Sequence, residues 1–187
     1  SSECTAKWYK SAFGVDDEKI FPIGLPRTDL MLDDSKRQKM QERFFEQYPD
    51  LRGKKITLYA PTFRDSQVEN PEICLDFDSL NQCMEENEVL LIRLHPHVAE
   101  HCPVGIWDMY PDKIRNVSDY PGVATLLSVA DQLITDYSSI IYEYCLLERK
   151  MIFYAYDYEV FQKDGRNFYE DYEKFVPGMI VYLSLIH

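Results

Sequence analysis

The feature that most constrains the fold is the alternation of short β-rich runs with stretches of helical character. Such alternation is typical of a parallel sheet with helices packed on its faces. We expect strands at 20–23, 55–59, 89–94, 114–117, 132–135 and 151–154, and helices at 5–13, 35–48, 77–87, 122–130 and 138–147. The sequence therefore predicts an α/β fold with a Rossmann-like parallel sheet and flanking helices. The strand order is not readable from this pattern.

Length and charge bound the class of protein. The 187 residues, of which 45% are hydrophobic, are enough for one compact domain with a sizeable core. The formal net charge of -12 argues against nonspecific nucleic-acid binding, because a phosphate backbone would be repelled on average. A local basic pocket for one small phosphorylated ligand is compatible with that charge. We expect no nucleic-acid partner.

Cysteine usage and hydropathy give further expectations. The five cysteines show no CxxC spacing and no Cys/His cluster, so we expect reduced thiols in a cytoplasmic protein and no metal site. No signal peptide is recognisable, and no apolar run approaches the roughly 20 residues of a membrane helix. The chain starts without Met and ends abruptly. We interpret it as a piece of a longer protein, whose membrane attachment would lie in other segments.

The strongest local signal is the stretch 133–141, in which a buried strand is expected to turn directly into a helix. Thr135, Asp136, Ser138 and Ser139 supply hydroxyls and a carboxylate around that first helical turn. Free backbone N–H groups and the positive helix end would make an anion site there. The alternative is an ordinary N-cap. Glycine is absent, so neither the dinucleotide nor the P-loop fingerprint applies.

Glu143 lies four residues after Ser139 and would share a helix face with it. A carboxylate in that position could accept hydrogen bonds from ribose hydroxyls. The alternative is a solvated helix face.

His95 lies at the end of a predicted strand, in the motif Arg93-Leu-His-Pro-His. We expect Pro96 to block a helix and to hold the histidine toward a cleft at the carboxyl end of the sheet. Its ring could give a proton to a leaving phosphate or pair with it. The alternative is a surface histidine after a core strand. Arg93 is a further candidate for contact with phosphate.

Two arginines are presented by turns. Arg64 follows a strand in the run Ala-Pro-Thr-Phe-Arg, and Arg27 lies in the turn Gly-Leu-Pro-Arg. A guanidinium offers a planar fork to phosphate oxygens. Either arginine could instead pair with a neighbouring carboxylate, Asp65 or Asp29. Taken together, two arginines, a helix start, hydroxyls and a histidine at strand ends form a set suited to a negatively charged nucleotide.

On these motifs the chain resembles the CDP-glycerol glycerophosphotransferase family of teichoic acid synthesis. The matching stretches are 24–29, 58–65, 93–97, 117–120, 131–147, 152–157 and 165–178. The resemblance implies a two-domain fold of the GT-B kind, in which residues 1–187 are a single donor-binding domain and the C-terminal half. The chain stops short of the family's closing helices, so this domain is expected to be incomplete.

The resemblance also implies roles for individual residues. His95 corresponds to the family's donor-side catalytic histidine, which acts on or near the pyrophosphate. The donor contacts that it implies are Thr135, Ser138 and Ser139 at the phosphates, with Arg64 and Asp136 as less certain members of the pocket. Cytosine would lie near the loop after Val117, with Ser118 and Tyr120 as candidates.

The reaction implied is attack by a hydroxyl of a lipid-linked glycerol phosphate acceptor on the β-phosphorus of CDP-glycerol, which expels CMP. No cofactor or tightly bound metal is expected. The family's second catalytic histidine, in a Trp-His-Gly-Thr type motif, is absent from this sequence, so the isolated chain should not catalyse transfer. The full-length protein would act at the inner face of the cell membrane. A homo-oligomer is left open.

Three alternatives remain at this point. The donor could be another CDP-polyol such as CDP-ribitol, because nothing in these residues separates the two. The chain could be a non-catalytic nucleotide-binding module that keeps the pocket without the chemistry. It could also be a plain flavodoxin-like domain with chance motifs, which binding of CDP or CMP would exclude.

Overall fold

The computed structural model describes residues 2–64, 73–102, 107–163, 168 and 170–182. Its centre is a six-stranded parallel sheet with the order β3-β2-β1-β4-β5-β6. The strands are β1 Lys55–Tyr59, β2 Glu88–Ile92, β3 Ile114–Asn116, β4 Gln132–Thr135, β5 Lys150–Tyr154 and β6 Met179–Val181. This order is that of a Rossmann-type sheet, and the predicted fold class is confirmed.

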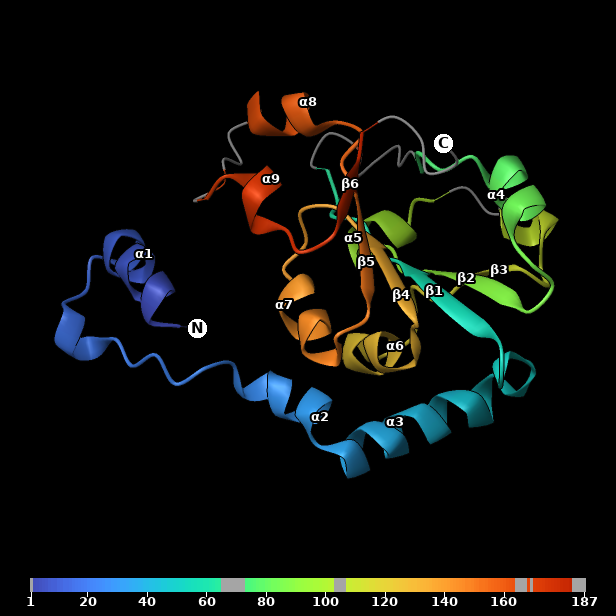
Figure 1. Cartoon of the computed structure of the whole chain (residues 1–187), viewed down its shortest axis with the longest axis horizontal. Helices are drawn as coiled ribbons and strands as arrows, with labels where there is room; N and C mark the ends of the chain where they lie inside the picture. The colour runs from blue at the N-terminus through green and yellow to red at the C-terminus, as the bar shows by residue number, and fades with distance from the viewer. Residues whose placement is uncertain (1, 65–72, 103–106, 164–167, 169, 183–187) are drawn as a thin grey trace.

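Helices cover both faces of the sheet (Figure 1). The α-helices of the described residues are α1 Glu3–Phe13, α2 Asp29–Leu32, α3 Asp34–Gln47, α4 Phe77–Cys83, α5 Pro96–Ala99, α6 Val123–Val129, α7 Ile141–Tyr144, α8 Tyr158–Lys163 and α9 Tyr172–Phe175. In Figure 1, α3 runs beside α6 along one side of the sheet, and α1 lies apart from it. Within the described ranges, no helix combines the length and apolar character needed to cross a bilayer.

Alternate residues of the central strands pack into two separate apolar cores. On β2, Val89 and Leu91 pack into the core beneath α3 and α6, whereas Leu90 and Ile92 pack into the core beneath α4 and α5. All four side chains are buried. Because successive strand residues point to opposite faces, a strand covered on both faces reads as a continuous apolar run. This explains why β2 was predictable from the sequence.

The strand expected at 20–23 is wrong. This segment belongs to no helix or strand, and Phe21 and Ile23 are 72% and 82% exposed. A β-rich run forms a strand only where a neighbour completes its hydrogen bonds, and no described strand pairs with it. The segment instead connects two 3-10 turns, η1 at Asp17–Lys19 and η2 at Pro26–Thr28.

Two expectations about helix starts are also wrong. Pro96 does not block a helix but occupies the first position of α5, where its missing N–H costs nothing. The helix expected over 138–147 starts only at Ile141, spans four residues as α7, and continues as a 3-10 turn at Cys145–Leu147. The Asp136 carboxylate accepts the backbone N–H of Tyr137, which favours a loop at that point.

Candidate functional site

The carboxyl ends of the parallel strands form one edge of the sheet. The strand order changes direction between β1 and β4, and in α/β proteins such a switch point is where ligands bind. Residues 60–64 leave β1 at this edge and residues 136–140 leave β4 beside them. His95 follows the next strand, β2, and Asp157 follows β5. The predicted site residues after β1, β2 and β4 therefore share one edge.

Arg64 lies at the switch point between two carboxylates, and we call Arg64, Asp136 and Asp157 the Arg64 cluster. Nε and Nη2 of Arg64 donate to Asp157 at 2.7 and 2.8 Å, and Nη1 donates to Asp136 at 2.8 Å. The side chain is 9% exposed. Burial disfavours its charge, but hydrogen bonds and charge from the two carboxylates outweigh burial and raise the pKa of Arg64. Arg64 is thus held by protein groups.

Aromatic rings enclose the same guanidinium. The rings that lie over it, with centroids 5.2 to 5.5 Å from its central carbon, are those of Tyr137, Tyr156 and Phe161. Cation–π attraction of this kind adds to the ion pairs. The predicted contact of Arg64 with phosphate would compete with all of these interactions. The alternative partner expected from sequence, Asp65, lies outside the described residues.

Asp136 connects the segments after β1 and β4. Its Oδ1 accepts the backbone N–H of Thr62 at 2.8 Å and that of Tyr137, and its Oδ2 accepts from Arg64. The residue is 2% exposed, and burial raises the pKa of its carboxyl although Arg64 opposes the shift. Because both oxygens are engaged inside the protein, Asp136 organises the edge rather than facing solvent.

The hydroxyl residues around β4 differ in accessibility. Thr135 is fully buried, and its hydroxyl donates to the Ala60 carbonyl at 2.7 Å. Contact between Thr135 and a phosphate would require that bond to break. Ser138 is half-buried and Ser139 is exposed, and both lie in the loop before α7. Of the predicted hydroxyls, those of Ser138 and Ser139 are the ones placed to meet a ligand.

His95 is exposed and is the N-cap of α5, with Nδ1 accepting the backbone N–H of His97 at 3.4 Å. Its ring stacks on Phe63, with centroids 4.4 Å apart and planes at 33°. Partial burial, His97 and Arg93 lower the pKa of His95 below the ordinary 6.5. The neutral ring therefore predominates at pH 7, and with Nδ1 as acceptor its proton is on Nε2, available to a ligand.

A small cavity joins His95 to the Arg64 cluster. It has a volume of about 30 Å³, the room of about one water molecule. The residues that line it include Thr62, Phe63, Arg64, His95 and Tyr156. The hydroxyl oxygen of Thr62 is buried and has no hydrogen-bond partner in the part of the chain that the structure describes. The cavity is too small for a nucleotide, so a donor would bind outside it, along the exposed side of His95.

Arg93 and Tyr120 form part of the scaffold beside the site. Nη1 of Arg93 donates to the backbone carbonyls of Val117, at 3.4 Å, and Tyr120. The ring of Tyr120 is buried against Phe44, with centroids 5.5 Å apart. Arg93 fixes the loop after β3, and Tyr120 anchors that loop to the core. A contact of Arg93 with phosphate or of Tyr120 with cytosine would compete with these interactions.

Ser118 is also directed inward. Its hydroxyl accepts the backbone N–H of Leu94 at 2.9 Å and donates to the Asn116 carboxamide at 2.6 Å. The residue is buried. These bonds couple the loop after β3 to the segment that carries His95, so the predicted contact of the Ser118 side chain with cytosine would have to displace them.

Arg27 and Glu143 form an ion pair near α7, which we call the Glu143 pair. The Arg27 side chain is 62% exposed, whereas that of Glu143 is 10% exposed. The solvated helix face considered as the alternative for Glu143 is therefore wrong, and Arg27 pairs with Glu143 rather than with Asp29. The second carboxylate oxygen of Glu143 is buried and has no hydrogen-bond partner among the residues that the structure describes.

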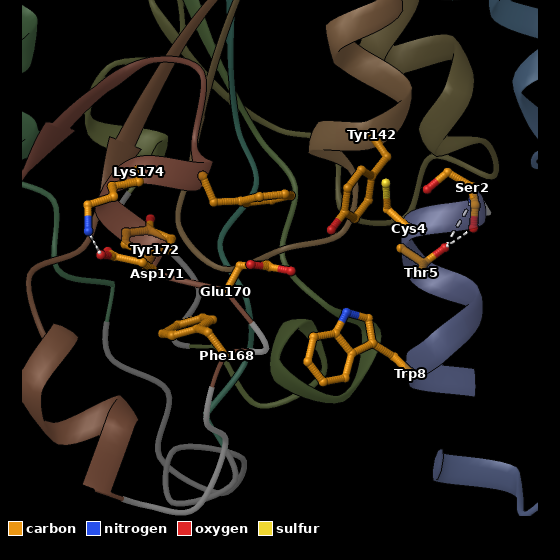
Figure 2. A pocket seen from close by; sticks show the side chains of 11 residues that line it. Ser2, Cys4, Thr5, Trp8, Tyr142, Phe168, Glu170, Asp171, Tyr172 and Lys174 are labelled. Atoms are coloured by element: carbon orange, nitrogen blue, oxygen red, sulfur yellow. Dashed lines mark hydrogen bonds and ion pairs between the residues drawn. The ribbon is translucent and has the colours of Figure 1, made fainter. Parts of the chain in front are cut away.

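A second, wider cavity lies elsewhere, between α1 and α9, with a volume of about 680 Å³ (Figure 2). Figure 2 shows Trp8 of α1 facing Phe168 and Glu170 across it, with Tyr142 of α7 at one side. None of the predicted site residues lines it. In the described part of the chain, no three His, Cys, Asp or Glu side chains gather as a metal site would require.

The comparisons with known proteins give the family. A model of the CDP-glycerol:poly(glycerophosphate) glycerophosphotransferase family matches residues 1–184. The chain belongs to this family. The resemblance inferred from the motifs is confirmed.

Individual relatives are longer than this chain. The ribitol-phosphate polymerase TarL of Staphylococcus aureus is 40% identical over 97% of this chain and 32% of its own length. The teichoic acid glycerol-phosphate transferase of the same species is 32% identical over 92% of this chain and 44% of its own length. A variant of the wall teichoic acid polymerase TagF soaked with CDPG superposes with a TM-score of 0.83 and 31% identity, covering 98% of this chain and 44% of that one. The chain thus spans less than half the length of these relatives.

Two residues at the edge were missed by the sequence analysis. Asp157 supplies half of the Arg64 cluster, and Phe63 stacks on His95. Both fall inside stretches that carried the family resemblance, 152–157 and 58–65. An aromatic residue between Thr62 and Arg64 was the available signal for Phe63. No local signal pairs Asp157 with an arginine 93 positions earlier.

Proposed function

We propose that this chain is the donor-binding part of a transferase that moves polyol phosphate from a CDP-activated polyol to an acceptor hydroxyl. The observation that carries the proposal is the family match over residues 1–184. CDP-glycerol is the first candidate donor because the family description names it. The position of His95 and two accessible serines at a sheet switch point supports a nucleotide site there.

In the proposed reaction, the acceptor hydroxyl oxygen forms a bond to the β-phosphorus and loses its proton. The bond from the β-phosphorus to the bridging oxygen breaks, and CMP leaves with that oxygen. The Nε2–H of His95 donates to the phosphate of the departing CMP, and Ser138 and Ser139 donate to phosphate oxygens. The Glu143 carboxylate accepts a hydrogen bond from a ribose hydroxyl. Arg64 supports this edge from behind through its two carboxylates.

The proposal extends to the full-length protein. Its acceptor is a lipid-linked polyol phosphate chain, and its reaction takes place at the inner face of the membrane. Relatives named as a teichoic acid polymerase and a teichoic acid primase are the reason for extending the proposal to polymer synthesis. The base that removes the acceptor proton belongs to a segment outside this chain.

The test is substitution of His95 in the full-length protein. We expect H95A to lower CMP release from CDP-glycerol by about 10²- to 10⁴-fold, the range for loss of a general acid or base. H101A removes an exposed histidine of the neighbouring turn and should leave turnover unchanged. Near-normal turnover of H95A would refute the assignment. Tight binding of CDP without any transfer by the wild type would favour a non-catalytic module.

CDP-ribitol is the second candidate donor. The ribitol-phosphate polymerase TarL shares more identity with this chain, 40%, than the glycerol-phosphate transferase does, 32%. Steady-state rates with both donors in the full-length protein would separate the candidates. A higher kcat/KM with CDP-ribitol would replace glycerol phosphate by ribitol phosphate in the proposal and leave the roles of the residues unchanged.

A further inference from the structure

Among the described residues, the ring of His95 has few partners. Its Nδ1 contact with the backbone of His97 is long, at 3.4 Å, and the side chain is exposed. The remaining ring contacts are with Phe63, at 4.4 Å between centroids, and with His97, at 5.0 Å. His97 is itself exposed. The orientation of the imidazole therefore depends on Phe63 more than on any hydrogen bond.

The two residues that flank Phe63 in the sequence are both held by the carboxylate of Asp136. Oδ1 of Asp136 accepts the backbone N–H of Thr62, and Oδ2 accepts from the Arg64 guanidinium, at 2.8 Å each. Thr62 and Arg64 are the two residues that flank Phe63. Arg64 is held in addition by a two-bond contact with Asp157. Bidentate pairs of this kind restrict geometry as well as adding energy.

We infer that Phe63 is a positioning residue for His95, and that the Arg64 cluster sets the position of Phe63. The contacts run across the sheet edge from β4, through the segment after β1, to the segment after β2. Holding a reacting group in productive geometry contributes to the rate without any contact between the holding residue and the substrate. This inference rests on the proposed function of His95 and adds a residue that supports it.

The stacking also bears on the charge of His95. Contact with an apolar ring removes water from the imidazole and disfavours its charged form. The charged or titratable groups that face the ring are Arg93 and His97, and Arg64 lines the same small cavity. Removal of the Phe63 ring would admit water and move the pKa of His95 up toward 6.5, while the opposing charges of Arg93 and His97 would remain.

The experiment compares F63L with F63Y in the full-length protein. F63L keeps an apolar side chain but loses the ring, and F63Y keeps the ring. F45L is the matched control, because Phe45 is also half-buried but lies on α3, away from His95. The measurements are the NMR titration of the His95 imidazole and the separate kcat and KM for CDP-glycerol.

We expect F63L to raise the pKa of His95 and to lower kcat by about 10- to 100-fold, the cost of a misplaced catalytic group, with KM nearly unchanged. F63Y should restore both values. Titration and kcat of F63L that match those of F45L would overturn the inference. The titration does not depend on turnover: a raised pKa in F63L together with full activity of H95A would refute the role of His95 in transfer while supporting its positioning by Phe63.

Discussion

The Arg64 cluster and the Glu143 pair both join an arginine to carboxylates near the carboxyl ends of the strands, yet they differ in completeness. In the cluster, each carboxylate oxygen of Asp136 and Asp157 accepts at least one hydrogen bond. In the pair, one oxygen of the buried Glu143 has no hydrogen-bond partner within the described ranges. The arginines differ too: Arg64 is 9% exposed and Arg27 is 62% exposed.

This difference separates a structural role from a binding role. A buried carboxylate oxygen without a partner carries the cost of desolvation, which a ligand donor can relieve. The cluster is satisfied by the protein alone and gains nothing from a ligand. The pair is completed only by an additional donor. Of the two arginine–carboxylate groups, the Glu143 pair is therefore the one left incomplete by the described residues, as its proposed contact with a ribose hydroxyl requires.

The largest expected effect is on stability, in R64A. Removing the guanidinium leaves the buried Asp136 and the half-buried Asp157 without their cation, and loss of one partner of a buried pair typically costs about 3–5 kcal/mol. Urea unfolding followed by circular dichroism would measure the loss. A loss below about 1 kcal/mol, as for an exposed pair, would show that the cluster is not the structural group described above.

A second variant tells charge from packing in the same cluster. R64M fills much of the same volume but also lacks the cation. If charge dominates, it should therefore be nearly as unstable as R64A while both aspartates remain. Combining R64M with D136N and D157N removes the unpaired charges and should recover part of the loss. No recovery would indicate that packing of the aromatic rings, rather than charge, dominates.

The sheet was predictable because its strands carry their own signal. The bounds of β1 and β4 agree with the expected 55–59 and 132–135, since Lys-Ile-Thr-Leu-Tyr and Gln-Leu-Ile-Thr are both rich in residues that favour strands. The failures occurred where tertiary contacts decide. The run at 20–23 has no neighbouring strand among the described residues, and the start of α7 is delayed by the Asp136 carboxylate, which accepts the N–H of Tyr137 and is itself held by Arg64.

The site was predictable in place but not in detail. Parallel strands bring their carboxyl ends to one edge, so His95, Arg64 and Ser138 could be expected to converge there. Which arginine meets a ligand could not be read from the sequence, because the answer depends on Asp157, 93 residues beyond Arg64. Thr135 and Ser118 look like ligand contacts in the motif, but their hydroxyls bond to backbone groups of neighbouring segments.

A smaller effect is expected for donor binding by E143Q. The amide keeps the size of the side chain but removes its negative charge, so a hydrogen bond to a ribose hydroxyl weakens. We expect affinity for CDP to fall about tenfold, or about 1.4 kcal/mol, within the range for hydrogen bonds to charged groups. Isothermal titration of the full-length protein would measure it.

The control for this variant is E148Q, which alters an exposed carboxylate at the end of the same helical segment. Its affinity for CDP should equal that of the wild type. Equal affinities for E143Q and the wild type would remove Glu143 from the donor pocket. The contrast between a structural role for the Arg64 cluster and a binding role for the Glu143 pair would then no longer hold.

The smallest effect is expected for R27A. An ion pair with one exposed partner contributes about 0.2–1 kcal/mol, and here the upper part of the range is expected because Glu143 is left buried without its cation. Urea unfolding of R27A, E143Q and the double variant would form a cycle that isolates the pair. In the double variant no unpaired charge is left, so it should be no less stable than R27A. A loss in R27A as large as that in R64A would mean that the two arginines have the same structural role, contrary to the difference in their burial.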